Sequence, residues 1–220
     1  MGLSPEATAE LVARLAESGV DFVKDDELMA DPPHSRFDDR VAAVMRVVNE
    51  HAERTGKKIM YAFNVSDELD AMLGHYQTAV EAGGTAVMVS VNSVGLAGVK
   101  KLCDQGTLPV HGHRNGWGML NRHPLLGIDF RAYQKLWRLA GVDHLHVNGL
   151  GNKFWKSDDS VVRSIAACGE PFPPRLASQL RHRDLPVRAQ GGEESRSAKP
   201  NDSTGFSVVG GSGTHHNDET

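Results

Sequence analysis

The sequence predicts an α/β fold built on a parallel sheet. Short apolar runs and longer amphipathic segments alternate from residue 4 to about residue 168, which is the pattern of parallel strands joined by helices. The run at 85–91 is almost continuously apolar, as in a strand that is buried on both faces. In a (β/α)8 barrel the carboxyl ends of the strands carry the active site. Polar residues stand at these ends: Lys24, Asn64, Asn92, His113 and Asn148.

Helices are expected where apolar residues recur at helical spacing between a capping residue and a glycine. Ser4 and Gly19 delimit the first helix, at 4–18. Asp129 and Gly141 delimit a later one in the same way. The other helices are expected at 36–54, from the cap Ser66 to Gly83, around 96–102, and from 157 through 165. The strands are expected at 20–24, 58–64, 85–91, 108–113 and 143–147.

Length, charge and cysteine content set broad limits on the function. With 220 residues, the chain is long enough for one domain with a sizeable core. The net charge of −4 and the pI near 6.2 give no reason to expect nucleic acid or an anionic membrane surface as a partner. No apolar run of about 18 residues predicts a membrane span. Cys103 and Cys168 are expected to be buried thiols in a reducing cytoplasm.

The first strand ends in a lysine and three acids, Lys24, Asp25, Asp26 and Glu27. Because alternate side chains of a strand point the same way, Lys24 and Asp26 share one face and Asp25 points away. We therefore expect Asp25→Asn to be far milder than Lys24→Ala. Mg²⁺ prefers oxygen ligands, and a Lys24 carbamylated by CO₂ would complete a site with Asp26 and Glu27. A solvated charged loop would account for the same residues.

Two histidine pairs follow later strands. His111 and His113 share a face of the strand at 108–113 and are followed by Arg114. An imidazole at this place can act as an acid or base near neutral pH, and Arg114 can hold a phosphate. A zinc pair, as in a zinc hydrolase, or a packed polar strand end are the alternatives.

The second pair, His144 and His146, precedes a glycine-rich segment at 149–153 that ends in Lys153. Such a loop can fold over a substrate and bring a positive charge to it. An ordinary exposed loop would have the same composition.

Taken in order, the three motifs resemble those of the ribulose bisphosphate carboxylase (RuBisCO) large chain and the RuBisCO-like proteins, over roughly residues 2–168. In metal hydrolases with a carbamylated lysine the histidine pair precedes the lysine, whereas here it follows. The resemblance implies homodimers or larger assemblies and a Mg²⁺ site with a carbamate on Lys24. Its site residues are then the metal ligands Lys24, Asp26 and Glu27, the catalytic residues Lys24, His113 and Lys153, and the phosphate-binding residues Arg114 and His146.

Two segments, 113–118 and 148–153, look like those of RuBisCO-like proteins rather than of true carboxylases. The resemblance therefore implies a Mg²⁺-dependent carbon–carbon lyase or isomerase that acts on a phosphorylated ketose or oxo sugar acid in carbohydrate metabolism. The reaction it favours is enolisation and decarboxylation, of the 3-oxo-isoapionate 4-phosphate decarboxylase type. The alternatives are an isomerase or enolase of 5-methylthioribulose 1-phosphate type and a catalytically inactive remnant.

The resemblance also bears on the organisation of the chain. Residues 1–168 are expected to form strands two to six of a (β/α)8 TIM barrel. In the family, an α+β domain and a first barrel strand with a catalytic lysine precede this region. Residues 169–220 lack helical or strand periodicity and are expected to be a disordered or unrelated tail. We therefore expect a fragment with open sheet edges at 20–24 and 143–147 and negligible turnover when isolated.

Overall fold

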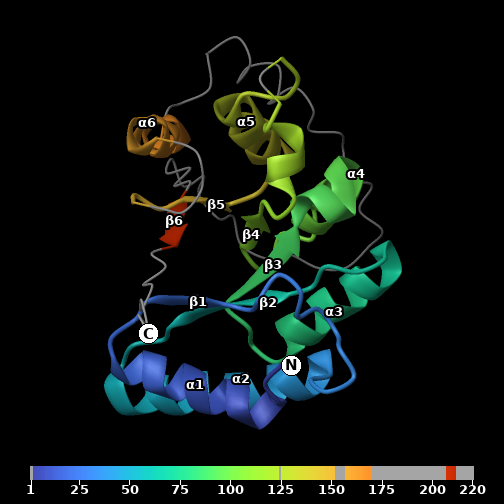
Figure 1. Ribbon diagram of the computed structural model, residues 1–220. Helices are drawn as coiled ribbons and strands as arrows, with labels where there is room; N and C mark the ends of the chain where they lie inside the picture. Colours follow the sequence, from blue (N-terminus) through green and yellow to red (C-terminus); the bar gives the residue numbers. More distant parts are fainter. Residues whose placement is uncertain (1, 124, 152–156, 170–206, 212–220) are drawn as a thin grey trace, which may run out of the picture.

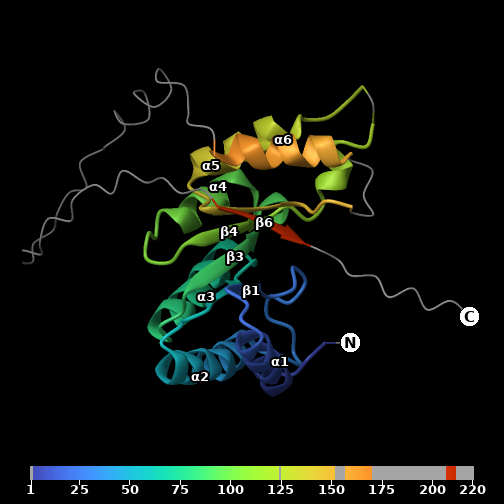
Figure 2. The ribbon, with the colours of Figure 1, turned by 90° about the vertical axis from the view of Figure 1, so that its left-hand side faces the viewer.

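The computed structural model describes residues 2–123, 125–151, 157–169 and 207–211. Its strands form one parallel sheet in which each strand lies beside its successor in sequence. Figures 1 and 2 show the sheet curving, with the helices on its outer side from α1 and α2 to α5 and α6. The expected partial (β/α)8 barrel is therefore confirmed. The strands are β1 (Phe22–Lys24), β2 (Met60–Asn64), β3 (Ala86–Ser90), β4 (Val110–His113), β5 (His144–Asn148) and β6 (Ser207–Gly211).

The helices begin and end where capping residues and glycines place them. Ser4 accepts a hydrogen bond from the Ala7 amide at 3.2 Å at the start of the first helix. Asp129 caps a later helix through the Arg131 amide, and Gly141 ends it with φ 107°. The helices are α1 (Pro5–Glu17), α2 (Phe37–Thr55), α3 (Leu69–Glu81), α4 (Val91–Cys103), the 3₁₀ helix η1 (Trp117–Leu120), α5 (Phe130–Ala140) and α6 (Asp158–Gly169).

The two faces of the sheet differ in what they bury. Side chains such as Tyr61, Val87 and Leu145 pack against the helices in the main hydrophobic core. The inner face carries a small separate cluster around Ala62 and Met88. Because side chains alternate along a strand, this division sends every second residue of each strand to the interior of the half-barrel. Lys24, His113 and His146, which are discussed below, are on that inner face.

Two helix starts differ from the prediction. Ser66 does not cap α3, because its hydroxyl accepts the Ser90 amide at 2.7 Å and so joins the ends of β2 and β3. The helix begins three residues later, at Leu69. The predicted helix around 96–102 begins at Val91, directly after β3, and bends at Gly95 with φ 77°. A sequence pattern does not distinguish a serine that caps a helix from one that joins two strands.

The tail contains a strand that was not expected. Ser207–Gly211 pairs in parallel with β5, from His144 beside Ser207 to Asn148 beside Gly211. The β5 strand is therefore not an open edge, whereas β1 pairs only with β2 among the described residues. Five residues that include two adjacent valines are too few to establish a period, which is why the sequence pattern missed them. Residues 170–206 and 212–220 lie outside the described part of the chain.

Gly112 provides a test of how tightly β4 is packed. A Cβ atom at this position would lie 2.9 Å from Val142 Cγ1 and 3.2 Å from both Leu145 Cδ1 and Val91 Cγ1. We predict that Gly112→Ala lowers the free energy of unfolding by about 1–3 kcal/mol in urea titrations, because the added methyl overpacks the core. Gly74→Ala is the control, since Gly74 lies in α3 with nothing within 4 Å of the new Cβ. The control should leave stability unchanged or raise it, and equal losses would contradict the packing argument.

Candidate active site

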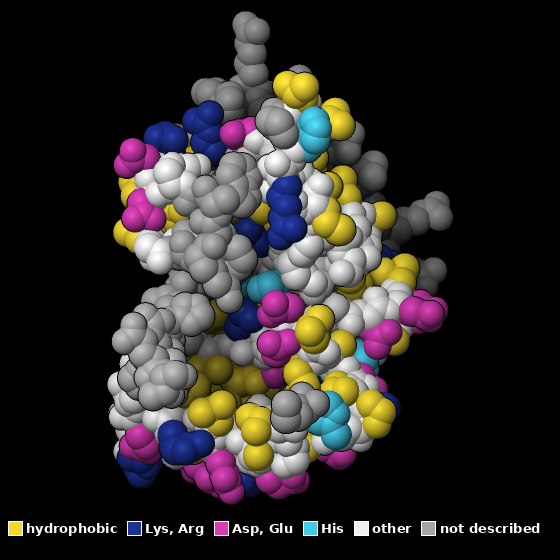
Figure 3. Space-filling model, viewed as in Figure 1, with side chains coloured by type: hydrophobic (Ala, Val, Ile, Leu, Met, Phe, Trp, Pro, Cys, Tyr) yellow, Lys and Arg dark blue, Asp and Glu magenta, His cyan; other side chains and the backbone are white. Residues whose placement is uncertain are grey.

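Three functional side chains meet at the carboxyl ends of β1 and β4. Glu27 Oε2 lies 3.7 Å from Lys24 Nζ and 3.7 Å from His113 Nε2. Burial works to raise the pKa of Glu27, but its own backbone amide and the charges of His113 and Lys24 together lower it. The carboxylate is therefore held in its charged form between two basic groups. Figure 3 shows acidic, basic and histidine side chains side by side near the middle of this face.

The neighbouring strands complete the inner rim. The rings of His113 and His146 lie with their centroids 4.8 Å apart, which brings the ends of β4 and β5 together. Asn64, at the end of β2, donates through Nδ2 to the Asp26 carbonyl at 3.1 Å. Burial lowers the pKa of His146 to about 3, because the charged imidazolium would lose its hydration and would face His113, Arg114 and Lys24. The convergence predicted from the strand ends is present in the structure.

The three expected metal ligands are only partly assembled. Lys24 and Glu27 are neighbours, but Asp26 is exposed and its Oδ1 accepts the Leu28 amide at 2.8 Å. Within the described residues, no group of three or more His, Cys, Asp or Glu side chains is arranged to hold a metal ion. In the unmodified chain, the cation beside Glu27 is the Lys24 ammonium itself. The donor set therefore suits Mg²⁺ only after Lys24 has become an anion.

Asp25 has a role that the sequence pattern did not reveal. It points away from Lys24, as expected, but it is 4 % exposed and its Oδ2 lies 3.2 Å from Nε of the fully buried Arg40. Tyr61 donates its hydroxyl to Oδ1, and the Asn64 amide donates to Oδ2 at 2.9 Å. Burial raises the pKa of Asp25, while Arg40 and the two other donors oppose the rise. The expectation that Asp25→Asn would be mild is therefore withdrawn, since breaking a buried ion pair is strongly destabilising.

A layer of rings lies deeper in the half-barrel, below these residues. His111 is 1 % exposed, with its ring centroid 5.3 Å from that of Phe22 and 5.8 Å from that of His144. Neither ring nitrogen of His111 has a hydrogen-bond partner within the part of the chain that the structure describes. Burial lowers the pKa of His111 to about 2, so the ring is neutral at physiological pH.

Arg114 follows His113 and turns back onto α5. Its guanidinium carbon lies 5.4 Å from the centre of the Phe130 ring, and its buried Nε has no hydrogen-bond partner among the residues described. Asn92 holds this turn by donating to the Asn115 carbonyl at 2.7 Å, while its own side-chain oxygen accepts from Tyr133 at 2.8 Å. The sequence predicts Asn92 only as a polar residue at the end of a strand. Its role in holding this turn depends on Tyr133, which is 41 residues away.

The glycine-rich loop after β5 is described only as far as Gly151. The Gly151 amide donates to Asp158 Oδ1 at 2.9 Å, which ties the start of the loop to the first turn of α6. Lys153, predicted to be catalytic, lies outside the described residues.

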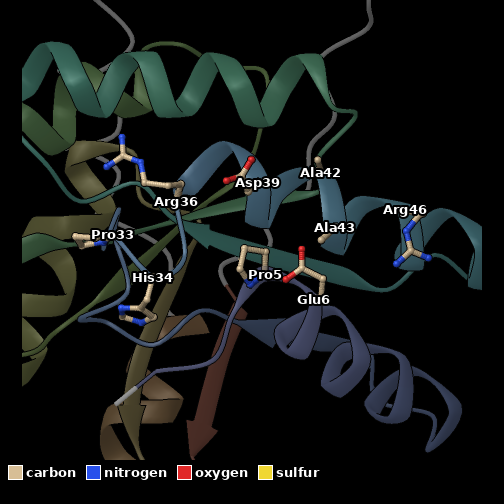
Figure 4. Close-up of a pocket in the computed structure, with 9 residues that line it drawn as sticks. All are labelled: Pro5, Glu6, Pro33, His34, Arg36, Asp39, Ala42, Ala43 and Arg46. Atoms are coloured by element: carbon tan, nitrogen blue, oxygen red, sulfur yellow. The ribbon is translucent and has the colours of Figure 1, made fainter.

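One cavity lies apart from this group of residues. It measures about 480 Å³ and lies between the start of α1 and the start of α2, open to solvent. Figure 4 shows Glu6 and Asp39 on its walls together with Arg36 and Arg46, so the lining carries both signs of charge. It contains none of the predicted site residues.

Comparison with known proteins gives a consistent result. The model of the ribulose bisphosphate carboxylase large chain, catalytic domain, matches residues 1–169. The chain is 52% identical over 172 residues to the 3-oxo-isoapionate-4-phosphate transcarboxylase/hydrolase of Xanthobacter autotrophicus, covering 78% of this chain and 42% of that protein. It is 45% identical over 173 residues to the 3-oxo-isoapionate-4-phosphate decarboxylase of Rhizobium rhizogenes, covering 78% and 41%. The chain thus spans less than half the length of these relatives.

Solved structures agree with the sequence comparison. A RuBisCO-like protein from Burkholderia fungorum superposes with a TM-score of 0.75 at 48% identity, over 78% of this chain and 42% of that chain. The octameric ribulose-1,5-bisphosphate carboxylase/oxygenase of Pyrococcus horikoshii gives a TM-score of 0.74 at 27% identity, over 78% and 41%. Among the described helices, none combines the length and the apolar character needed to cross a membrane.

The buried histidines predict a dependence of stability on pH. His111 and His146 have pKa values of about 2 and about 3 in the folded chain, against an ordinary value of 6.5. Below pH 6.5 the unfolded chain binds protons that the folded chain excludes, so stability is lost as the pH falls toward 3. We predict that each of these histidines lowers the free energy of unfolding by about 1.4 kcal/mol per pH unit in that window.

Urea titrations between pH 7 and pH 5 measure this slope. The variant His111→Leu should have a shallower slope than the unaltered chain. Equal slopes in the variant and in the unaltered chain would show that His111 does not contribute.

Proposed function

Because the chain belongs to the family of the ribulose bisphosphate carboxylase large chain, we propose that it carries part of a Mg²⁺-dependent active site for a phosphorylated oxo sugar acid. The reaction we propose is the decarboxylation of 3-oxo-isoapionate 4-phosphate, the compound in the names of relatives at 52% and 45% identity. The observation that carries the proposal is the meeting of Lys24, Glu27 and His113 at one end of the sheet.

The metal ligands we propose are Lys24, Asp26 and Glu27, with CO₂ bound as a carbamate on Lys24. Carbamylation would turn Lys24 from a cation into an anion and so reverse the charge that now faces Glu27. When bound, Mg²⁺ supplies Lewis-acid stabilisation of negative charge on a substrate oxygen. Support comes from the contact between Lys24 and Glu27 and from the position of Asp26 on the same short segment.

We assign the stabilisation of negative charge on the substrate to His113. Its Nδ1 accepts the Asn115 amide at 3.3 Å, so in the neutral ring the proton is on Nε2. Nε2 is also the atom that faces Glu27. Burial and the nearby Lys24 charge lower the pKa of His113, which favours this neutral form. Decarboxylation leaves negative charge on the substrate, and the Nε2–H of the neutral ring beside the site can stabilise that charge by donating a hydrogen bond to it.

The phosphate group of the substrate is assigned to Arg114 and His146. Support comes from Arg114 Nε and His146 Nδ1, which have no hydrogen-bond partner among the described residues. The Arg114 charge also acts on His146, whose pKa it helps to lower. Lys153 is proposed as a further catalytic residue that the glycine-rich loop brings to the substrate.

Other activities remain as alternatives. Transfer of a carboxyl group is one alternative to simple decarboxylation, because the relative at 52% identity is named a transcarboxylase/hydrolase. The isomerase or enolase of 5-methylthioribulose 1-phosphate type and the inactive remnant are further alternatives.

A homo-oligomer is proposed because a solved relative is described as octameric. A cytoplasmic location also stays a prediction.

Lys24→Ala tests the proposed metal site. With ¹³C-bicarbonate and Mg²⁺, the unaltered chain should show a carbamate resonance in ¹³C NMR, and the variant should lack it. In a relative with a complete barrel and the same stretch, the substitution should lower Mg²⁺-dependent decarboxylation by about 10²–10³-fold or more, because the site loses a ligand.

Lys57→Ala is the matched control, since Lys57 is a lysine at the opposite end of the sheet that donates to the Gly19 carbonyl at 2.9 Å. It should leave the carbamate resonance unchanged. Metal analysis should find Mg²⁺ rather than zinc. Zinc at stoichiometric amounts, with no effect of Mg²⁺ or CO₂, would replace the proposal with the zinc hydrolase interpretation.

A further inference from the structure

We propose that Asp25, Arg40 and Tyr61 are positioning residues that hold the metal-binding segment in place. We call these three residues the Asp25 clamp. The clamp lies on the helix-facing side of the sheet, directly behind Lys24, and the Asp25 side chain points away from the site. The inference rests on the proposed function for its link to Mg²⁺, but its geometry is independent of the metal.

The carboxylate of Asp25 is the centre of the clamp. One oxygen accepts the Tyr61 hydroxyl, and the other accepts Arg40 Nε at 3.2 Å and the Asn64 amide at 2.9 Å. Both charged side chains are buried, with Arg40 at 0 % and Asp25 at 4 % exposure. A charge pair removed from water in this way persists only when further hydrogen bonds satisfy it, and here they do.

Arg40 extends the clamp along the loop between β1 and α2. Its Nη1 donates to the Ser35 carbonyl at 2.7 Å. Its Nη2 donates to the Met29 and Ala30 carbonyls at 2.9 and 2.6 Å. One guanidinium therefore holds three carbonyls of the loop that begins with Asp25. A guanidinium has five donors in a fixed planar fork, which a lysine ammonium at this place would not reproduce.

The clamp reaches the candidate ligands through the backbone. Lys24 Nζ donates to the Asp25 carbonyl at 3.0 Å, so fixing the Asp25 backbone also fixes the lysine head. Asn64 binds two successive residues. Its backbone amide donates to the Asp25 carboxylate, and its side-chain Nδ2 donates to the Asp26 carbonyl. The turn that leads to Glu27 is thus held from behind. Such outer partners typically change metal affinity about 10–100-fold when they are removed.

The test is Tyr61→Phe, which removes one hydroxyl and keeps the ring. We expect Mg²⁺ affinity in bicarbonate buffer, measured by calorimetry, to fall about 10-fold or more. We also expect faster hydrogen exchange at the Leu28 and Met29 amides, which donate to Asp26 Oδ1 and to the Asp26 carbonyl. The exchange readout needs no metal.

Tyr76→Phe is the matched control. Tyr76 is also buried, and its hydroxyl accepts two amides, those of Thr107 and Leu108, ahead of β4 at the other end of the sheet. The control should lower thermal stability without changing Mg²⁺ affinity or the exchange of Leu28 and Met29. If both variants change Mg²⁺ affinity equally, or neither does while the unaltered chain binds Mg²⁺, the clamp is only a stabilising contact and the proposal is overturned.

Arg40→Lys separates geometry from charge. It keeps the positive charge beside Asp25 but loses the fork, so Leu28 and Met29 should again exchange faster, by a factor at least as large as in Tyr61→Phe. Unchanged exchange in both variants would overturn the proposal. If the unaltered chain binds no Mg²⁺ while the two variants still speed exchange, the proposed function fails and the clamp stands.

Discussion

The two-residue period of a β-strand governs which side chains of β1 and β4 face the site. At the end of β1 it turns Lys24 inward and the following Asp25 outward, so a reactive group and its anchor are adjacent in sequence but lie on opposite faces of the sheet. In β4 the same period sends His111 and His113 inward and leaves Gly112 against the helices. Alternate side chains of one strand therefore contribute to the site on the inner face and to packing against the helices on the outer face.

Much of the fold and the rim of the site could be predicted from sequence because their signals are local. Caps such as Ser4 and Asp129 delimit helices, and polar residues after apolar runs mark the strand ends. The convergence of Lys24, His113 and His146 followed from the rule that parallel strands place their carboxyl ends on one edge. These inferences need only short windows of sequence.

The features that escaped prediction depend on partners distant in sequence. Asp25 was assigned an outward direction correctly, but its partner Arg40 is 15 residues away in a helix, and Tyr61 is 36 residues away. Ser66 was predicted to cap a helix, but its hydroxyl accepts the Ser90 amide instead. That contact depends on a strand 24 residues later in the sequence and leaves no local signal. The strand at Ser207–Gly211 is defined by its pairing with β5, and its own five residues show no periodic pattern of apolar residues. In each case tertiary context decided the outcome.

The consecutive order of the strands has a consequence for how the chain is assembled. Each new strand lies beside the one made just before it, so the sheet extends at one edge and no segment has to pass between strands already paired. From β1 to β5, each contact between neighbouring strands closes a loop of one helical unit, so the entropic cost is similar at each of these steps. A chain of this kind can fold vectorially, unit by unit, as it leaves the ribosome. At each stage the growing edge is also the place where any further strand, from this chain or another, can be added.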